Sequence, residues 1–365
     1  MKRNVITIFI VLALALLAAG CDRSSSSSGP NNLTVGGAGV TIDQVQGSAA
    51  PAIAATALDI NDNNQAVGYL EATAGATFTA ALWTVGAATA TPRALAPLAG
   101  NTFSAAFAIA GTGRAVGQSA KGTRLVAVTW PVGATVPTEL PALDAAGNSA
   151  AFDISADGAC IVGEAQNASL ATRAVIWVAN AGGAFTNPPI VLPVSLVGSA
   201  FSSASGVVRA GTQIWVAGNA EDDAGIPHAT LWRSADGAVF TATDLTTAGE
   251  AGSSALAVNA AGKVVGEAET SPGVFAAALW AADNTGVYRR TILAADGVAM
   301  GINTAGKAVG TAAGLATAWD TTAPLTGATT LFNTPSQAYG NNNGDASGYL
   351  VIGVNNGKGF VKKVN

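Results

Sequence analysis

One motif recurs seven times between residue 57 and the carboxyl terminus, and this repeat constrains the fold of the 365-residue chain more than any other feature. Each copy begins with Ala and a short apolar run, passes through a turn containing Gly or Asn, and closes on aliphatic residues followed by Gly. The leading alanines recur every 39 to 53 residues, at Ala57, Ala106, Ala151, Ala204, Ala255, Ala299 and Ala338. Such a period is typical of solenoids, propellers and other arrays.

A second signature follows in six of the units, an apolar run that ends in Trp. These tryptophans are Trp83, Trp130, Trp177, Trp232, Trp280 and Trp319. A turn-rich stretch and another short strand-like run come after each Trp, so each unit holds four strand candidates. Four short strands in about 45 residues form one propeller blade. The sequence therefore predicts an all-β fold, a β-propeller of seven four-stranded blades spanning residues 33–365.

The two ends of the predicted propeller complement each other. The last unit stops shortly after Gly359–Val361, where the Trp strand stands in the other units, and so lacks a fourth strand. A strand-like segment at Leu33–Val45 precedes the first leading alanine. We expect this segment to complete the seventh blade and close the ring. Closure would remove unpaired strand edges, which invite aggregation.

The amino terminus has the pattern of an export signal. Lys2 and Arg3 precede the uncharged run Val5–Leu17, which is shorter than the ~20 residues that span a bilayer. The sequence Leu17-Ala-Ala-Gly-Cys21 resembles the lipobox of bacterial lipoproteins. The resemblance implies a signal peptide at 1–20, cleavage before Cys21 and a covalent lipid on its sulfur. The alternative is a plain secretory signal with an incidental cysteine.

Residues 21–32 are rich in serine and are expected to form a flexible tether between the lipid and the folded body. Asp22 resembles the inner-membrane retention signal of enteric lipoproteins. We therefore expect a lipid-anchored protein of the bacterial cell envelope, on the periplasmic face or the cell surface, with Asp22 favouring the inner membrane. Cys160 would then have no disulfide partner, and its apolar surroundings predict a buried side chain.

Two segments carry a family resemblance. The run Ile302-Asn-Thr-Ala-Gly-Lys-Ala-Val-Gly310 and the run Pro227-His-Ala-Thr-Leu-Trp232 resemble the two halves of the HAF family of probable extracellular repeats. That family has the motif Ile-Asn-x-x-Gly-x-x-Val-Gly followed by a strand of the His-Ala-Phe-Leu-Trp type. The resemblance extends from about residue 55 to the end, although one unit of seven keeps the His. It implies an exported, propeller-like protein and no established chemistry.

Composition excludes several functional classes. Charged residues make up 11% of the chain, against roughly 25% in typical globular proteins. The balance of 17 basic and 22 acidic residues offers no patch for nucleic acid. One His and two Cys leave little for a metal cluster or a His-based dyad, and no G-x-S-x-G, C-x-x-C or P-loop motif is present. We predict no catalytic residue, no cofactor beyond the lipid, and a monomer.

Two polar stretches offer oxygen ligands that a cation could use. Asp59, Asn61 and Asn63 offer oxygen ligands at alternating positions, as calcium loops do. The stretch lacks the distal Glu of such loops and coincides with the turn of the repeat, where Asn and Asp are favoured on their own account. The acidic triplet Glu221, Asp222 and Asp223 suggests either solvated surface or a weak cation site. No metal is predicted, and calcium stays an alternative.

Two further residues are candidates for ligand binding. His228 is the only His in the chain, and Arg209 opens the Arg209–Gly225 stretch, which we expect to be a long loop of the fourth unit. The six repeated tryptophans are expected to pack between blades rather than to stack on sugars. Paired carboxylates remain open, because any of the 22 acids could converge at the channel mouth, but no pattern singles out a pair.

Together these features predict a binding or scaffolding module whose ligand is unknown, with an envelope protein or a glycan as partner. Two alternatives remain on the same fold. The first is a glycan-active hydrolase or lyase, and the second is a purely structural surface protein. Two nearby carboxylates at one mouth of the axial channel, beside a pocket, would favour the enzyme.

Overall fold

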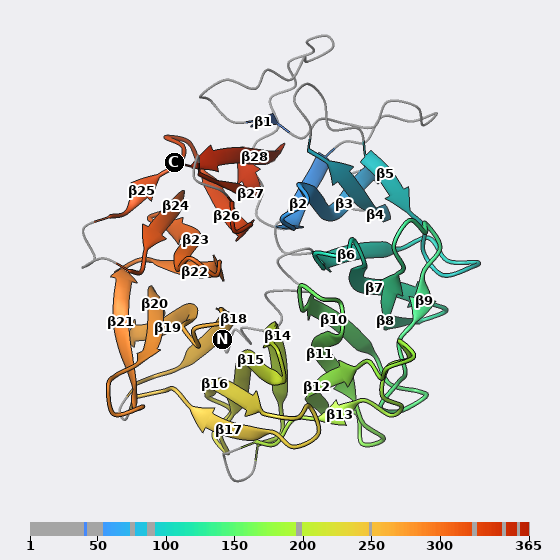
Figure 1. Ribbon diagram of the computed structural model, residues 1–365, viewed down its shortest axis with the longest axis horizontal. Coiled ribbons are helices and arrows are strands. Elements are labelled where there is room, and N and C mark those ends of the chain that lie inside the picture. The colour runs from blue at the N-terminus through green and yellow to red at the C-terminus, as the bar shows by residue number, and fades with distance from the viewer. Residues whose placement is uncertain are drawn as a thin grey trace.

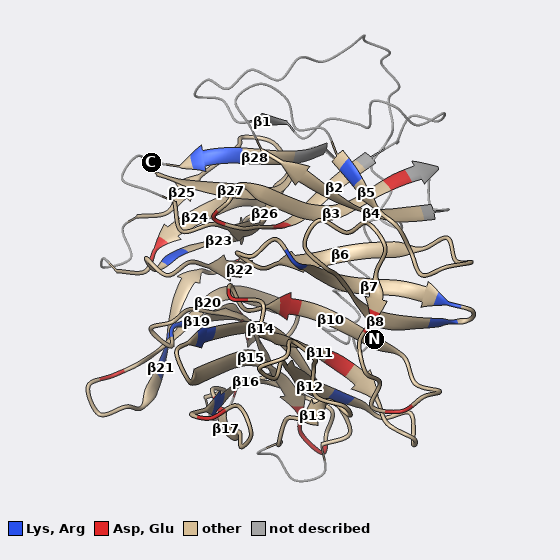
Figure 2. Ribbon diagram, turned by 45° about the vertical axis from the view of Figure 1, so that its right-hand side comes forward, with Lys and Arg blue, Asp and Glu red and all other residues tan. Residues whose placement is uncertain are grey.

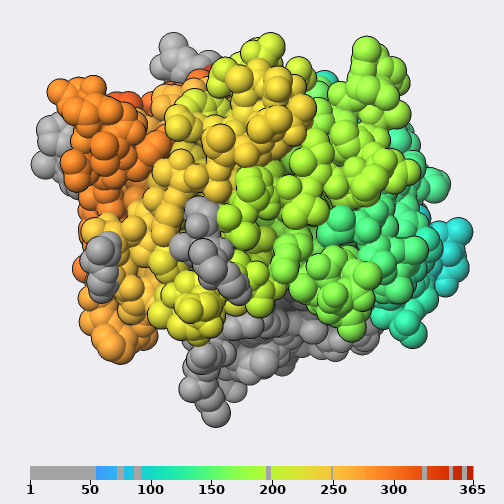
Figure 3. Space-filling view, turned by 90° about the horizontal axis from the view of Figure 1, so that it is seen from below, coloured from blue at the N-terminus to red at the C-terminus, as the bar shows by residue number. Residues whose placement is uncertain are grey.

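The structure, a computed structural model, describes residues 40–41, 54–73, 77–85, 92–194, 199–247, 250–322, 327–344, 348–355 and 358–364. In this part the chain forms seven antiparallel sheets of four strands each. The sheets surround one central axis as the blades of a propeller (Figure 1). Seen from the side, the blades follow one another in chain order (Figure 3). The predicted fold is therefore confirmed.

Each blade contributes one strand to each of four concentric positions. The inner strands are β2 (Ala54–Ile60), β6 (Ser104–Ile109), β10 (Ser149–Ile154), β14 (Ser202–Ala210), β18 (Ser253–Val258), β22 (Gly297–Ile302) and β26 (Ser336–Asn341). The second strands are β3 (Gln65–Thr73), β7 (Ala115–Lys121), β11 (Cys160–Gln166), β15 (Gln213–Glu221), β19 (Val264–Ser271), β23 (Lys307–Ala312) and β27 (Tyr349–Asn355). The third strands are β4 (Thr77–Thr84), β8 (Arg124–Trp130), β12 (Thr172–Val178), β16 (Pro227–Ser234), β20 (Val274–Ala282), β24 (Leu315–Asp320) and β28 (Lys358–Val364). The outer strands are β5 (Pro92–Leu95), β9 (Thr138–Glu139), β13 (Ile190–Val191), β17 (Thr241–Asp244), β21 (Tyr288–Ala294), β25 (Thr329–Thr330) and β1 (Val40–Thr41).

The amino-terminal strand closes the ring. In the seventh sheet the order is β1-β28-β27-β26, and Val40 pairs with Val361 in an antiparallel register. Strand β1 lies beside β28 in Figure 1. The predicted clasp is confirmed for this strand, the described part of the 33–45 segment. The predicted signal peptide at 1–20 and tether at 21–32, with the lipidated Cys21 and Asp22, lie outside the described residues.

A β-bulge in every inner strand explains the Ala and Gly of the repeat. In β10 the register shifts between Ala151 and Asp153, which leaves Phe152 as the extra residue. Ala151 is fully buried, and the backbone beside it is so close that a Cβ on Gly163 would lie 1.9 Å from the carbonyl oxygen of Ala150. All seven blades repeat this contact, so the second strand must carry Gly at this position.

The repeated tryptophans pack between blades, as predicted. All six are at most 3% exposed. Three of them also donate an indole N–H to the preceding blade, such as Trp177 to the carbonyl of Pro141 at 2.8 Å. Trp215, which lies outside the repeated position, is only half-buried, and the Arg233 guanidinium lies over its ring. The six equivalent rings therefore serve packing rather than ligand stacking.

Polar side chains bridge neighbouring blades at two repeated positions. The Asn of the turn donates to a carbonyl of the next blade, as from Asn61 to Ala110 at 2.8 Å and from Asn303 to Asn342 at 2.9 Å. A serine at the start of five inner strands accepts an N–H from the third strand of the preceding blade; these serines are Ser104, Ser149, Ser202, Ser253 and Ser336. Such bonds fix the angle between blades and thus the shape of the central channel.

Charged side chains are sparse over the propeller (Figure 2). Cys160 is completely buried, as predicted, and burial raises the pKa of its thiol to about 11. The expectation of a long loop at Arg209–Gly225 is wrong: β14 continues to Ala210, and β15 occupies Gln213–Glu221. This stretch is an extended hairpin because its residues pair continuously across the turn. The described residues include no helix that could cross a membrane.

Candidate functional site

The axial channel contains a cavity of about 280 Å³, lined by the inner strands of all seven blades. The bulged residue of each inner strand lines it, and these residues are Leu58, Phe107, Phe152, Ser205, Leu256, Met300 and Tyr339. Six of the seven have large, mainly apolar side chains. We call this set the bulge ring. Because a bulge re-aims the side chain of its extra residue, one structural irregularity repeated seven times gives the cavity its apolar wall.

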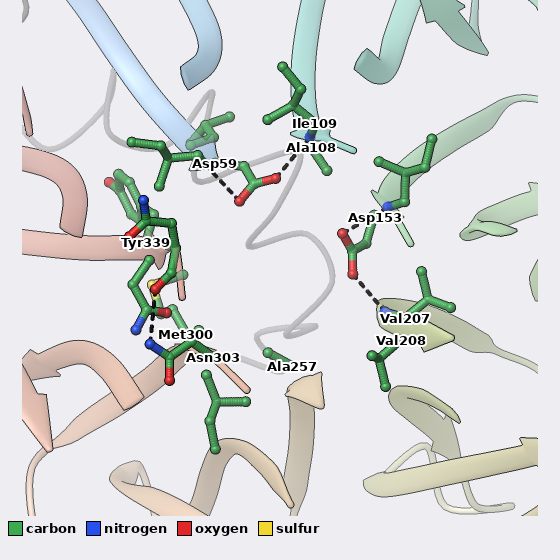
Figure 4. Close-up of a pocket in the computed structure, with 18 of the residues that line it drawn as sticks. Asp59, Ala108, Ile109, Asp153, Val207, Val208, Ala257, Met300, Asn303 and Tyr339 are labelled. Atoms are coloured by element: carbon green, nitrogen blue, oxygen red, sulfur yellow. Dashed lines mark hydrogen bonds between the residues drawn. The ribbon is translucent and has the colours of Figure 1, made fainter. Parts of the chain in front are cut away.

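Two carboxyl groups stand next to the bulge ring. Asp59 and Asp153 each follow the bulged residue of their strand, in the first and third blades, and both line the cavity (Figure 4). The other five blades have Ala or Gly at this position, namely Ala108, Gly206, Ala257, Gly301 and Gly340. Blade contacts at this level can therefore form without a carboxyl group.

Main-chain N–H groups hold both carboxyl groups in place. The Oδ1 of Asp59 accepts from Ile60 and its Oδ2 accepts from Ile109 of the next blade, both at 2.8 Å. Asp153 repeats this pattern with Ile154 at 2.8 Å and Val207 at 2.6 Å. Each carboxyl group thus bridges two blades. Every oxygen keeps further lone-pair capacity, because an ionised carboxylate can accept about four hydrogen bonds.

The two acids differ in their affinity for protons. Burial raises the pKa of Asp59 from 3.8 to about 6, against the opposing effect of its two N–H donors. Burial also raises the pKa of Asp153, to about 8, and repulsion from Asp59 adds to that shift. Near neutral pH the two acids together therefore hold about one proton. The pair then carries about one negative charge.

The cation candidates of the first blade separate in the structure. Asp59 lines the channel, whereas Asn61 and Asn63 lie in the following turn and donate to the carbonyls of Ala110 and Gly111. The Oδ1 of Asn61 accepts the N–H groups of Asn63 and Gln65. These bonds account for the polar residues of the turn through blade contacts. Among the described residues, no group of three or more His, Cys, Asp or Glu side chains could hold a metal ion.

In the fourth blade, His228 lies between two acids, of which Asp222 is one of the sequence candidates. Its Nδ1 lies 2.9 Å from the Oδ2 of Asp244, and its Nε2 lies 3.7 Å from the Oδ2 of Asp222. Asp222 also accepts the N–H groups of Ala224 and Ile226 through its Oδ1. The imidazole therefore links the β15–β16 connection to the end of β17. In an up-and-down blade, the connection between the second and third strands lies at the opposite end of the blade from the turn that follows the inner strand.

The remaining candidates do not join this cluster or the channel into one site. Glu221 ends β15, and Asp223 is exposed in the connection after it. Arg209 is exposed near the end of β14, and its Nη1 donates to the Oδ2 of Asp157 at 3.0 Å. That ion pair joins the third and fourth blades. None of these three side chains lines the axial cavity.

The sequence did not single out Asp153 or the bulge ring. A signal for Asp153 was present, since the seven copies, aligned on their leading alanines, carry an acid two residues later only at Asp59 and Asp153. The bulge ring has no comparable signal, because six of its members have large side chains in common but no single residue type recurs in all seven blades. In a regular strand, consecutive side chains point to opposite faces. Regular alternation would therefore not predict that a bulged residue and the acid after it both line the cavity.

No family model matches the chain, so the HAF resemblance gains no support from one, and no curated protein matches it. Among solved structures, a puromycin-hydrolysing peptidase of Mycobacterium tuberculosis is similar at 12% identity and a TM-score of 0.51, over 85% of this chain and 52% of that one. TolB from Acinetobacter baumannii matches at 13% identity and a TM-score of 0.42, over 83% of this chain and 64% of that one. The gluconolactonase XC5397 from Xanthomonas campestris matches at 14% identity and a TM-score of 0.43, over 88% and 100%. At these identities the likeness concerns the fold alone.

Proposed function

We propose that the protein is a lipid-anchored binding module of the bacterial envelope that takes a small ligand into its axial channel. The observation that carries this proposal is the cavity itself. The bulge ring lines it, and two blades add a carboxyl group at the position where the other five have Ala or Gly. Ligand pockets are typically apolar hollows with a few well-placed polar groups. The channel has both properties.

The size of the cavity indicates the kind of ligand. Its volume of about 280 Å³ lies at the lower end of small-molecule pockets, which run from roughly 300 to 1,000 Å³. A free small molecule, or the end group of a larger envelope component, fits this space better than a folded partner does. Binding in the channel is therefore preferred over a purely structural or scaffolding role.

A channel-filling variant tests this function. Ser205 is the one small member of the bulge ring, so Ser205→Phe places in the fourth blade the side chain that Phe107 and Phe152 already contribute to theirs. We expect the wild-type protein, exposed to an extract of envelope small molecules, to retain compounds detectable by mass spectrometry. Ser205→Phe should lose them, while Val239→Phe, at an exposed turn, should keep them. Equal retention by all three proteins would contradict channel binding.

The two carboxyl groups also favour a second function, a glycan-active hydrolase. One protonated and one ionised carboxyl group in the same cavity is the arrangement that acid–base hydrolysis requires. Binding is preferred because it needs only the cavity and its two carboxyl groups, whereas hydrolysis also requires a set separation between the two groups. Hydrolysis of chromogenic glycosides by the wild-type protein, abolished in both Asp59→Asn and Asp153→Asn, would establish the enzyme instead.

The lipid anchor is part of the proposal and is supported by the lipobox-like sequence that ends at Cys21. Lipidation there would hold the propeller at a membrane through a serine-rich tether. Labelled palmitate should enter the wild-type protein and not Cys21→Ser. Label in that variant would refute the anchor. Membrane fractionation of Asp22→Ser against the wild-type protein would then test retention in the inner membrane.

A further inference from the structure

We infer that the channel ligand is a cation, a small apolar molecule bearing one primary ammonium group that pairs with the carboxyl groups of Asp59 and Asp153. This inference rests on the channel binding proposed above and specifies its ligand class. The apolar body of the ligand would lie against the bulge ring. Three features of the channel support it: its charge, its wall and its size.

The charge of the channel lacks a counter-ion. The ionisable side chains that line the cavity are Asp59, Asp62, Asp153, Tyr69 and Tyr339, and no Lys, Arg or His stands among the described lining residues. Asp62 lies toward the turns after the inner strands, where it accepts two bonds from Asn343. A carboxylate removed from water without a cationic partner is costly. A ligand ammonium would supply the missing charge.

The carboxyl groups are not part of the general solution for joining blades. Five blades place Ala or Gly where the first and third place Asp. Blades therefore pack at this level without a carboxyl group, as at Ala257 and Gly301, and without the cost of burying a charge. Their presence beside the cavity points to an external partner that recovers the cost of burying them.

The wall and the volume limit the rest of the ligand. Phe107 and Phe152 lie together in the bulge ring, with ring centroids 5.8 Å apart. Aromatic faces attract ammonium groups as well as apolar carbon. A cavity of about 280 Å³ holds on the order of ten non-hydrogen atoms, at about 30 Å³ per water-sized group. An arylalkylamine of the size of phenethylamine meets all three limits.

Proton release gives the inference a specific signature. Because an ammonium group favours the ionised form of both acids, its binding lowers their pKa values and releases part of the proton that the pair holds near neutral pH. The pKa values of about 6 and about 8 place the effect between these two pH values. Affinity should therefore rise with pH across this window, by up to about tenfold per unit, and then level off.

Calorimetric titration of the full-length protein with phenethylammonium tests the inference, with 2-phenylethanol as the neutral isostere. We expect the ammonium probe to bind at least about tenfold more tightly than the alcohol at pH 8. Titrations at pH 7 in buffers of different ionisation enthalpy should show release of up to one proton. Asp153→Asn should abolish this release and weaken the ammonium probe alone. The control variant is Asp223→Asn. Asp223 is exposed and lies at the end of the blade opposite the turns that follow the inner strands, so this variant should behave as wild type.

The outcomes separate this inference from the proposed function. Equal affinity for the ammonium and the alcohol, with both blocked by Ser205→Phe, would overturn the cation and leave channel binding in place. Binding of neither probe at millimolar concentration would also overturn the cation, while the retention experiment decides the channel independently. Asp59→Asn, which removes the other carboxylate, provides a second test in case Asp153→Asn does not fold. Proton release on binding is measured with the wild-type protein alone, so this test does not depend on the folding of any variant.

Discussion

Replacing Asp153 by Asn should stabilise the protein in alkaline solution and destabilise it modestly in acid. In the folded protein, burial and repulsion from Asp59 raise the pKa of Asp153 from 3.8 to about 8. Below the unfolded value, both states are protonated and the group contributes no difference. As the pH rises toward 8, the unfolded chain ionises while the folded one keeps its proton, so the wild-type protein loses stability. The amide of Asn does not titrate and escapes this loss.

The magnitude follows from the same pKa values. A shift of one unit corresponds to about 1.4 kcal/mol, so the rise from 3.8 to about 8 amounts to about 6 kcal/mol once the folded group has ionised. In acid the amide has the shape of the protonated carboxyl but only one acceptor oxygen, so its NH2 group faces one of the two main-chain N–H groups, of Ile154 or Val207, that the carboxyl oxygens accept. The variant should therefore be less stable there by about 1–3 kcal/mol, the cost of a buried donor without an acceptor.

Urea unfolding, followed by the fluorescence of the buried tryptophans, measures this difference. The free energies of unfolding of wild type, Asp153→Asn and Asp223→Asn should be compared at several values between about pH 4 and pH 9. The stability of Asp153→Asn relative to wild type should rise with pH, with most of the change falling between about 4 and 8. Parallel pH profiles for wild type and Asp153→Asn would refute a raised pKa and, with it, the electrostatic description of the channel.

Four further outcomes are expected. Trp177→Phe should lower the free energy of unfolding by about 1 kcal/mol more than Trp280→Phe, because Trp177 donates to Pro141 and Trp280 has no acceptor among the described residues; equal losses in urea would contradict this. Asn303→Ala should cost about 1–3 kcal/mol in the same assay, since the main-chain N–H and C=O groups it contacts are buried. Cys160 should resist a thiol reagent until the protein unfolds, and rapid labelling would show that its pocket opens. Deleting residues 33–45 should lower the melting temperature of the whole propeller, which an unchanged temperature would disprove.

The architecture could be predicted because its central contacts are repeated. Ala151 and Gly163 meet at a backbone approach that tolerates no larger side chain, and every blade contains the same pair. The Trp and the turn Asn recur for similar reasons, since each fills or bridges the same gap between blades. A contact made seven times leaves the same residues seven times in the sequence. The closing strand followed from counting strands rather than from any motif.

The channel could not be predicted in the same way, because its chemistry lies in the residues that differ between copies. A search for residues shared by all copies overlooks Asp59 and Asp153, because only two copies carry an acid at this position. In addition, the bulge places two consecutive residues, such as Phe152 and Asp153, against one partner residue. Simple alternation along a strand does not reveal that geometry. The comparison between copies is nevertheless informative once the structure aligns them. Five blades show what the fold requires at this position, and the two acids that depart from it are therefore the residues to explain by function.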